Sequence, residues 1–110
     1  MSLPFDFVLF EAGMSHLSDE EKSKLLSLLK LTQTIQAYGF LEIMGLADRT
    51  GQSAKNENLA KIRGIAVFNF LVKHGFPKEC IKLLKYQVVS GSTPEERKKF
   101  RSVKLAVRPK

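Results

Sequence analysis

The chain has 110 residues, 44% of them hydrophobic, which is enough for one compact core and too little for two, so we expect a single domain over residues 1–110. No apolar run approaches the roughly 18 residues of a membrane-spanning helix, and the single cysteine, Cys80, excludes an internal disulfide and a cluster of cysteine metal ligands. The net charge of +7 is unevenly spread, because residues 1–54 carry four Lys or Arg against seven Asp or Glu, whereas residues 55–110 carry fourteen against four; the second half therefore favours an anionic partner without distinguishing nucleic acid, lipid or acidic polymer.

The first half predicts a strand, a helix and a second strand. The run FDFVLF over residues 5–10 has the length and composition of a strand. Ser18 and Glu21 form a capping box, in which Ser18 accepts from the amide of Glu21 and Glu21 reaches back. The helix that starts there should fade near residues 31–33, and AYGFLEIMG over residues 37–45 predicts a central strand.

A loop and a long amphipathic helix follow. Residues 47–58 are small and polar, which is typical of a loop, and Asn58 is the expected cap of the next helix. Gly75, preceded by Lys73 and His74, is the expected left-handed end of that helix. Its apolar stripe consists of Leu59, Ile62, Ala66 and Phe70, widened by Val67 and Leu71.

The last third predicts two strands around a short basic helix. The strands lie over residues 81–89 and 103–108, and Thr93 caps the helix between them. The order is β-α-β-α-β-(α)-β. It predicts an α+β fold of two layers, a mixed sheet with helices on one face, in which the last strand can return antiparallel.

An ordered set of motifs resembles the OmpA-like domain family. The segment GLADRTG over residues 45–51 is similar to the family pattern G-x-T-D-x-x-G, and Asn56, Leu59 and Arg63 follow at the spacing of N-x-x-L-S-x-x-R-A. Asp48 and Arg63 are 15 residues apart, as in the family, and RSVKL over residues 101–105 stands where the family has an R-R-V-x-I strand.

The resemblance implies non-covalent binding of peptidoglycan through the diaminopimelate of its stem peptides. In the family the aspartate and the helix arginine, here Asp48 and Arg63, hold the diaminopimelate end. That end carries an ammonium and a carboxylate, which one carboxylate and one guanidinium complement. By the same matching, Asn56 orients the loop or ligand, and Arg101 contacts the carboxylate. Without the resemblance, Asp48 can instead cap its loop and Arg63 can pair with Glu57 on the helix surface.

Several positions depart from the family pattern. Each replaces a donor, acceptor or shaped backbone segment of the pocket: Gly13, Ala47, Ala60, Gly64, Lys85–Gln87 and Ser102. One alternative is therefore a degenerate member that serves only protein–protein interaction. Another is a basic nucleic-acid-binding α/β domain, because Lys98, Lys99 and Arg101 surround Phe100.

Catalysis, cofactors and metals are not expected. The sequence has no His paired with an acid at a suitable spacing, no nucleophile elbow and no phosphate-binding glycine loop, and His16 and His74 stand apart. The resemblance implies a periplasmic or envelope location and peptidoglycan as the partner, with other envelope proteins in addition and no nucleic acid. We expect the carboxy-terminal part of a longer bacterial protein, whose export signal or anchor lies outside this fragment.

Overall fold

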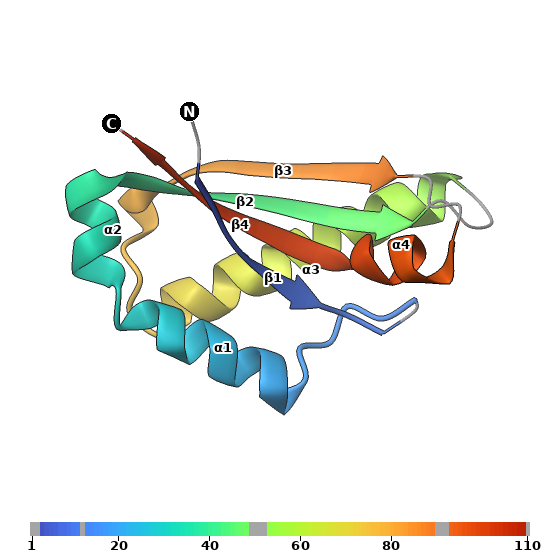
Figure 1. Cartoon of the computed structure of the whole chain (residues 1–110), viewed down its shortest axis with the longest axis horizontal. Helices are drawn as coiled ribbons and strands as arrows, with labels where there is room; N and C mark the ends of the chain where they lie inside the picture. The colour runs from blue at the N-terminus through green and yellow to red at the C-terminus, as the bar shows by residue number, and fades with distance from the viewer. Residues whose placement is uncertain (1–2, 12, 49–52, 90–92, 110) are drawn as a thin grey trace.

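The computed structural model describes residues 3–11, 13–48, 53–89 and 93–109 (Figure 1). Its elements in chain order are β1 (Leu3–Leu9), α1 (Asp19–Leu29), α2 (Thr32–Tyr38), β2 (Gly39–Asp48), α3 (Ser53–Lys73), a 3-10 turn (Lys78–Cys80), β3 (Ile81–Val89), α4 (Pro94–Lys99) and β4 (Ser102–Pro109). Within these ranges, no helix has both the length and the apolar character needed to cross a membrane.

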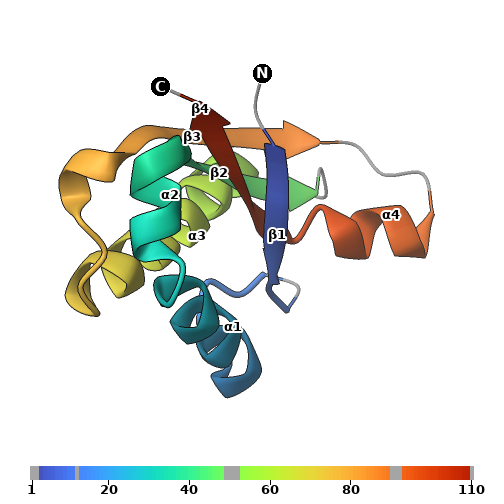
Figure 2. The same ribbon diagram turned by 60° about the vertical axis from the view of Figure 1, so that its left-hand side comes forward.

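The four strands form one mixed sheet in the order β1-β4-β2-β3. β2 and β3 run parallel, and β4 runs antiparallel to both β2 and β1. Figures 1 and 2 show α1, α2 and α3 on one face of the sheet and α4 at one end of it. The predicted α+β fold, with a mixed sheet, helices on one face and an antiparallel last strand, is confirmed.

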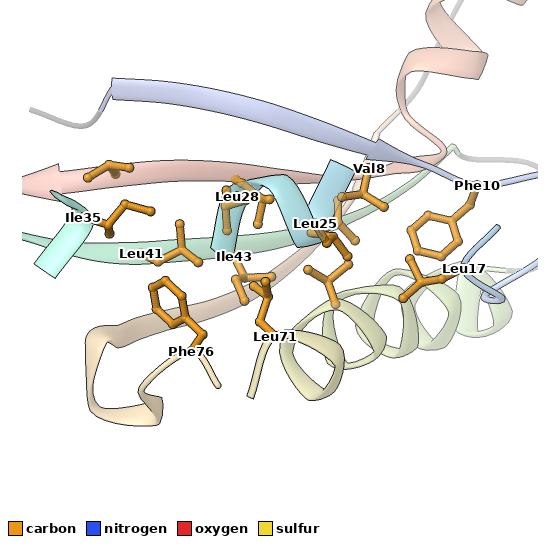
Figure 3. Close-up of a cluster of buried hydrophobic side chains, with 14 residues drawn as sticks. Val8, Phe10, Leu17, Leu25, Leu28, Ile35, Leu41, Ile43, Leu71 and Phe76 are labelled. Carbon is orange, nitrogen blue, oxygen red and sulfur yellow. The ribbon is translucent and has the colours of Figure 1, made fainter. Parts of the chain in front are cut away.

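The hydrophobic core lies between the sheet and the three helices (Figure 3). Along β2 the side chains alternate, so that Leu41 and Ile43 are fully buried while Glu42 and Met44 are only half-buried. The other main core residues are Val8, Val103, Leu105 and Val107 from the sheet and Leu25, Leu28, Ile35, Val67 and Leu71 from the helices. Each such side chain contributes about 1.5–3 kcal/mol by leaving water.

The hydrogen bonds of Ser18 and Glu21 at the start of α1 differ in part from the predicted capping box. Ser18 Oγ accepts from the N–H of Glu21 at 3.3 Å, as predicted. The carboxylate of Glu21 instead accepts from the N–H of Leu9 at 2.6 Å and from Lys24 Nζ at 3.0 Å. Glu21 is 6% exposed, so this buried carboxylate fastens α1 to the end of β1.

A second helix, α2, occupies residues that the sequence assigned to a fading helix and to the start of a strand. Helix α1 ends at Leu29 and α2 begins at Thr32, whose Oγ1 donates to the carbonyl of Leu29 at 2.6 Å. Ile35 is 3% exposed and anchors the new helix to the core. The predicted strand over residues 37–45 is confirmed as β2 except for its start, because Ala37 and Tyr38 belong to the helix that the buried Ile35 anchors.

The long helix α3 begins at Ser53, five residues before the predicted cap Asn58. Its end matches the prediction: Gly75 has φ +106°, its N–H donates to the carbonyl of Val72, and the N–H of Phe76 donates to that of Leu71. The buried stripe is shifted by one position from the predicted one and consists of Asn56, Ala60, Arg63, Val67 and Leu71, whereas Ile62 is 40% exposed.

Candidate binding site

Three of the four predicted site residues gather at one end of the sheet. Asp48 is the last residue of β2, and Arg101 directly precedes β4. Arg63 lies in the middle of α3 and reaches the carbonyl of Leu46 near the end of β2. β1, β2 and β3 all end here, at the right in Figure 1, which is the position where α/β folds commonly bind ligands.

The side chain of Arg63 is 0% exposed, and all three of its nitrogens donate to backbone carbonyls. Nε donates to Met14 at 2.9 Å, Nη1 to Leu46 at 3.0 Å and Nη2 to Glu11 at 3.1 Å. The guanidinium carbon also lies 5.3 Å from the centre of the Phe10 ring. Arg63 therefore ties the β1–α1 connection to β2 and α3, and it is not the surface residue paired with Glu57 that the sequence left open.

Helix α3 packs very close to β2, and this lets the Arg63 side chain reach the backbone of that strand. A Cβ atom on Gly45 would lie 1.9 Å from the carbonyl oxygen of Ala60 and 3.0 Å from the nitrogen of Gly64. Only a glycine fits at that point of the strand. The small residues Ala60 and Gly64, two of the departures from the family pattern, thus lie at the contact that positions the arginine.

Asp48 and Arg101 form a loose ion pair at the edge of this buried centre. Arg101 Nε lies 3.8 Å from Asp48 Oδ1, and the two side chains are 27% and 12% exposed. The Nε atom of Arg101 is buried and lacks a hydrogen-bond partner within the described structure. A buried donor without an acceptor is costly, so the present arrangement leaves the Arg101 side chain incompletely satisfied.

The charges at this end of the sheet are coupled. Burial lowers the pKa of Arg63 from its usual value to about 10, the negative charge of Asp48 opposes that decrease, and the positive charge of Arg101 adds to it. At neutral pH the guanidinium stays protonated. Two arginines lie near Asp48, and an ion of either sign therefore finds a group of opposite charge at this end of the sheet.

The remaining predicted residue, Asn56, lies elsewhere on the same stripe of α3. It is 7% exposed and already has an interaction partner in the structure. It stands seven positions before Arg63, or about 10 Å along the helix at 1.5 Å per residue. Asn56 therefore lies on the same face of α3 as Arg63 but does not contact it directly.

A hollow of about 280 Å³ adjoins Arg101 on the side of β1 and α1. The described residues that line it are Leu9, Phe10, Glu11, His16, Ser18, Glu20, Glu21, Lys98 and Arg101. Among the four predicted residues, Arg101 alone lines it. The sequence analysis missed Glu11 and considered Lys98 only for nucleic-acid binding; Glu11 could have been found because it follows the predicted first strand at the same end of the sheet as Asp48.

Ser102, which replaces the second arginine of the family pattern, has a structural role. Its side chain is 0% exposed, and Oγ donates to the carbonyl of Lys99 at 2.7 Å. It therefore closes the end of α4 and fixes the turn that carries Arg101.

The nucleic-acid alternative requires aromatic side chains exposed on a sheet face. In the described part of the chain, the exposed aromatic side chains are Tyr38 and Tyr86. Tyr38 belongs to α2, and Tyr86 lines a hollow with Glu57 and Lys61 of α3, on the helix-covered side. Phe100 is half-buried. None of these positions forms a stacking platform.

Comparisons with known proteins give a consistent picture. The sequence profile of the OmpA family matches residues 9–102. The fold is similar to the C-terminal domain of MotB from Helicobacter pylori, with a TM-score of 0.79 and 17% identity over 92% of this chain and 82% of that one. It is also similar to the peptidoglycan-associated lipoprotein of Burkholderia pseudomallei, with a TM-score of 0.75 and 19% identity over 93% and 89% of the two chains.

A third structure of similar fold is an outer membrane protein from Borrelia burgdorferi B31. Its TM-score is 0.69, with 22% identity over 96% of this chain and 87% of that one. A search of curated protein sequences gave no match. At such identities the structural similarity establishes a shared fold.

Proposed function

Since the chain belongs to the OmpA family, we propose that it binds peptidoglycan non-covalently, through the diaminopimelate of the stem peptides, and so anchors an envelope protein or complex to the bacterial cell wall. In this proposal the domain works in the periplasm and has no catalytic role. One solved structure of the same fold is named as a peptidoglycan-associated lipoprotein, which supports the choice of polymer.

The loose pair of Asp48 and Arg101 carries the proposal. A diaminopimelate end presents an ammonium and a carboxylate next to each other. The carboxylate of Asp48 would accept from the ammonium, and the partly exposed guanidinium of Arg101 would donate to the carboxylate. Separating the two side chains costs little, because at 3.8 Å they share no hydrogen bond.

Arg63 supports the site by holding its backbone in place, because its guanidinium is already hydrogen-bonded and not free to bind the ligand. A guanidinium has five N–H bonds, and three of those of Arg63 point to carbonyls of Glu11, Met14 and Leu46. Its charge raises the local potential for a ligand carboxylate, and its bonds hold the β1–α1 connection beside Arg101. We assign Asn56 to orienting the start of α3.

Retention on purified sacculi tests the proposal. We expect Asp48→Asn and Arg101→Gln each to reduce the fraction of domain that sediments with sacculi at least tenfold, since each removes one half of the zwitterion match. Free diaminopimelate should compete with retention of the unaltered domain. Circular dichroism checks that both variants are folded.

The matched control is Glu42→Gln. Glu42 and Arg108 form another carboxylate–guanidinium pair, at 3.0 Å, six residues before Asp48 along β2 and so about 20 Å away at 3.3 Å per residue. Its loss should leave retention unchanged. If folded Asp48→Asn and Arg101→Gln are retained as well as this control, the site is wrong. If the unaltered domain is not retained at all, the domain serves protein–protein interaction alone.

A further inference from the structure

Among the described helices, only α4 borders the second face of the sheet, where its last residue, Lys99, lines a hollow together with strand residues. Figures 1 and 2 show α1, α2 and α3 on the opposite side. The exposed side is formed by the alternate residues of β2, β3 and β4 that point away from the core, together with Lys99 at the end of α4. We use the name basic sheet face for the surface made by Glu42, Met44, Lys85, Lys99, Lys104 and Arg108.

This surface is strongly cationic. Its residues include four Lys or Arg and one acid, Glu42, which is already paired with Arg108. Lys85, Lys99 and Lys104 take part in none of the ion pairs between described side chains. Three uncompensated positive charges therefore remain close together on one face, and they attract a partner of opposite charge.

Two adjoining hollows lie between these cations, of about 220 and 380 Å³, and both are lined by Met44 and Lys104. Uncharged side chains also line them: Ala106 lines the smaller one, and Leu46, Gln87, Val89 and Phe100 line the larger one. The combination of an apolar centre and a charged rim is typical of protein–protein interfaces.

We infer that the basic sheet face binds an acidic polypeptide segment of a partner protein, whose apolar side chains enter the two hollows while its carboxylates meet Lys85, Lys99 and Lys104. A nucleic acid fits the charge but not the hollows, since no exposed aromatic side chain among those described lies here for a base to stack on. The surface shares no residue with the proposed peptidoglycan site of Asp48, Arg63 and Arg101, although its larger hollow adjoins that site through Val89, which pairs with Asp48.

Selection from a random 12-residue peptide library displayed on phage tests the inference. We expect enrichment of sequences that combine Asp or Glu with Leu, Ile or Phe. For a selected peptide, the double variant Lys85→Glu/Lys104→Glu should weaken the dissociation constant at least tenfold. Amide shifts in the NMR spectrum of the labelled domain should cluster on β2 and β4 around Met44 and Lys104.

The control is Lys61→Glu/Lys73→Glu, which changes the net charge equally on exposed positions of α3. It should leave the affinity within twofold, and both double variants should stay folded by circular dichroism and bind sacculi like the unaltered domain. An equal loss in the control, no enriched acidic peptide, or tighter binding of a single-stranded 20-nucleotide DNA at the same residues would each overturn the inference. Self-association that Lys85→Glu/Lys104→Glu abolishes would do so too, by making a second copy the occupant.

Discussion

Arg63 holds three segments of the backbone together from a fully buried position. Its three hydrogen bonds reach Glu11 and Met14 in the β1–α1 connection and Leu46 in β2. The bond to Leu46 is buried, and the carbonyl of Glu11 also accepts from the N–H of Met14 at 3.0 Å. The residue that the family pattern assigns to the ligand is therefore also a main part of the folded structure.

We predict that Arg63→Ala lowers the free energy of unfolding by about 3–5 kcal/mol, because it removes three hydrogen bonds of a buried side chain and opens a cavity. Arg63→Lys should recover only part of this loss, since an ammonium cannot reach three divergent carbonyls. Urea denaturation followed by circular dichroism measures both values. A loss below about 1 kcal/mol for Arg63→Ala would contradict the structural role.

The position of Arg63 shows what the sequence could and could not give about the site. The resemblance predicted that Asp48 and Arg63 face one pocket at one end of the sheet; both lie at that end, but neither lines the hollow beside Arg101. Its burial was missed because the apolar stripe of α3 was read from Leu59 and Ile62, one position away from the true stripe. A charged residue at a core position gives no apolar signal, so hydrophobic periodicity passes over it.

Gly45 controls how closely β2 and α3 pack. The carbonyl of Ala60 occupies the space that a side chain on this residue would need. Arg63 lies one turn further along the same helix, so the distance between helix and sheet also sets how deep its guanidinium reaches. The glycine is thus required by packing and not by a left-handed backbone.

Gly45→Ala should destabilise the domain by about 1–3 kcal/mol, because the helix must move away from the strand. Gly75→Ala is the comparison: its Cβ would meet nothing within 4 Å, but its φ of +106° makes any side chain strained. We expect the larger fall in melting temperature for Gly45→Ala, together with chemical-shift changes around Arg63. Equal effects confined to each mutated turn would contradict the packing argument.

At the level of elements, local patterns predicted the four strands and three of the four helices. The caps at Ser18, Thr93 and Gly75 were correct because each depends on neighbouring residues alone. The start of α3 and the whole of α2 were missed. Both depend on burial of a single side chain, Asn56 or Ile35, against elements far away in the sequence.

In the whole molecule, the last strand lies between the first and the second. β4 pairs with both β1 and β2 and supplies Val103, Leu105 and Val107 to the core. A chain that ends at Arg101 should therefore show no cooperative thermal transition, whereas a chain that ends at Arg108 should keep one. Differential scanning calorimetry distinguishes the two, and a sharp transition in the shorter chain would contradict the topology.

The pairing of Leu3 with Val107 brings the beginning of β1 and the end of β4 together, at the sheet end away from Asp48. A fusion partner or a surface linker joined at either terminus would leave from that end. When the domain is attached to a solid surface through such a linker, its candidate wall-binding residues point away from that surface. The surface would therefore not block the binding of sacculi.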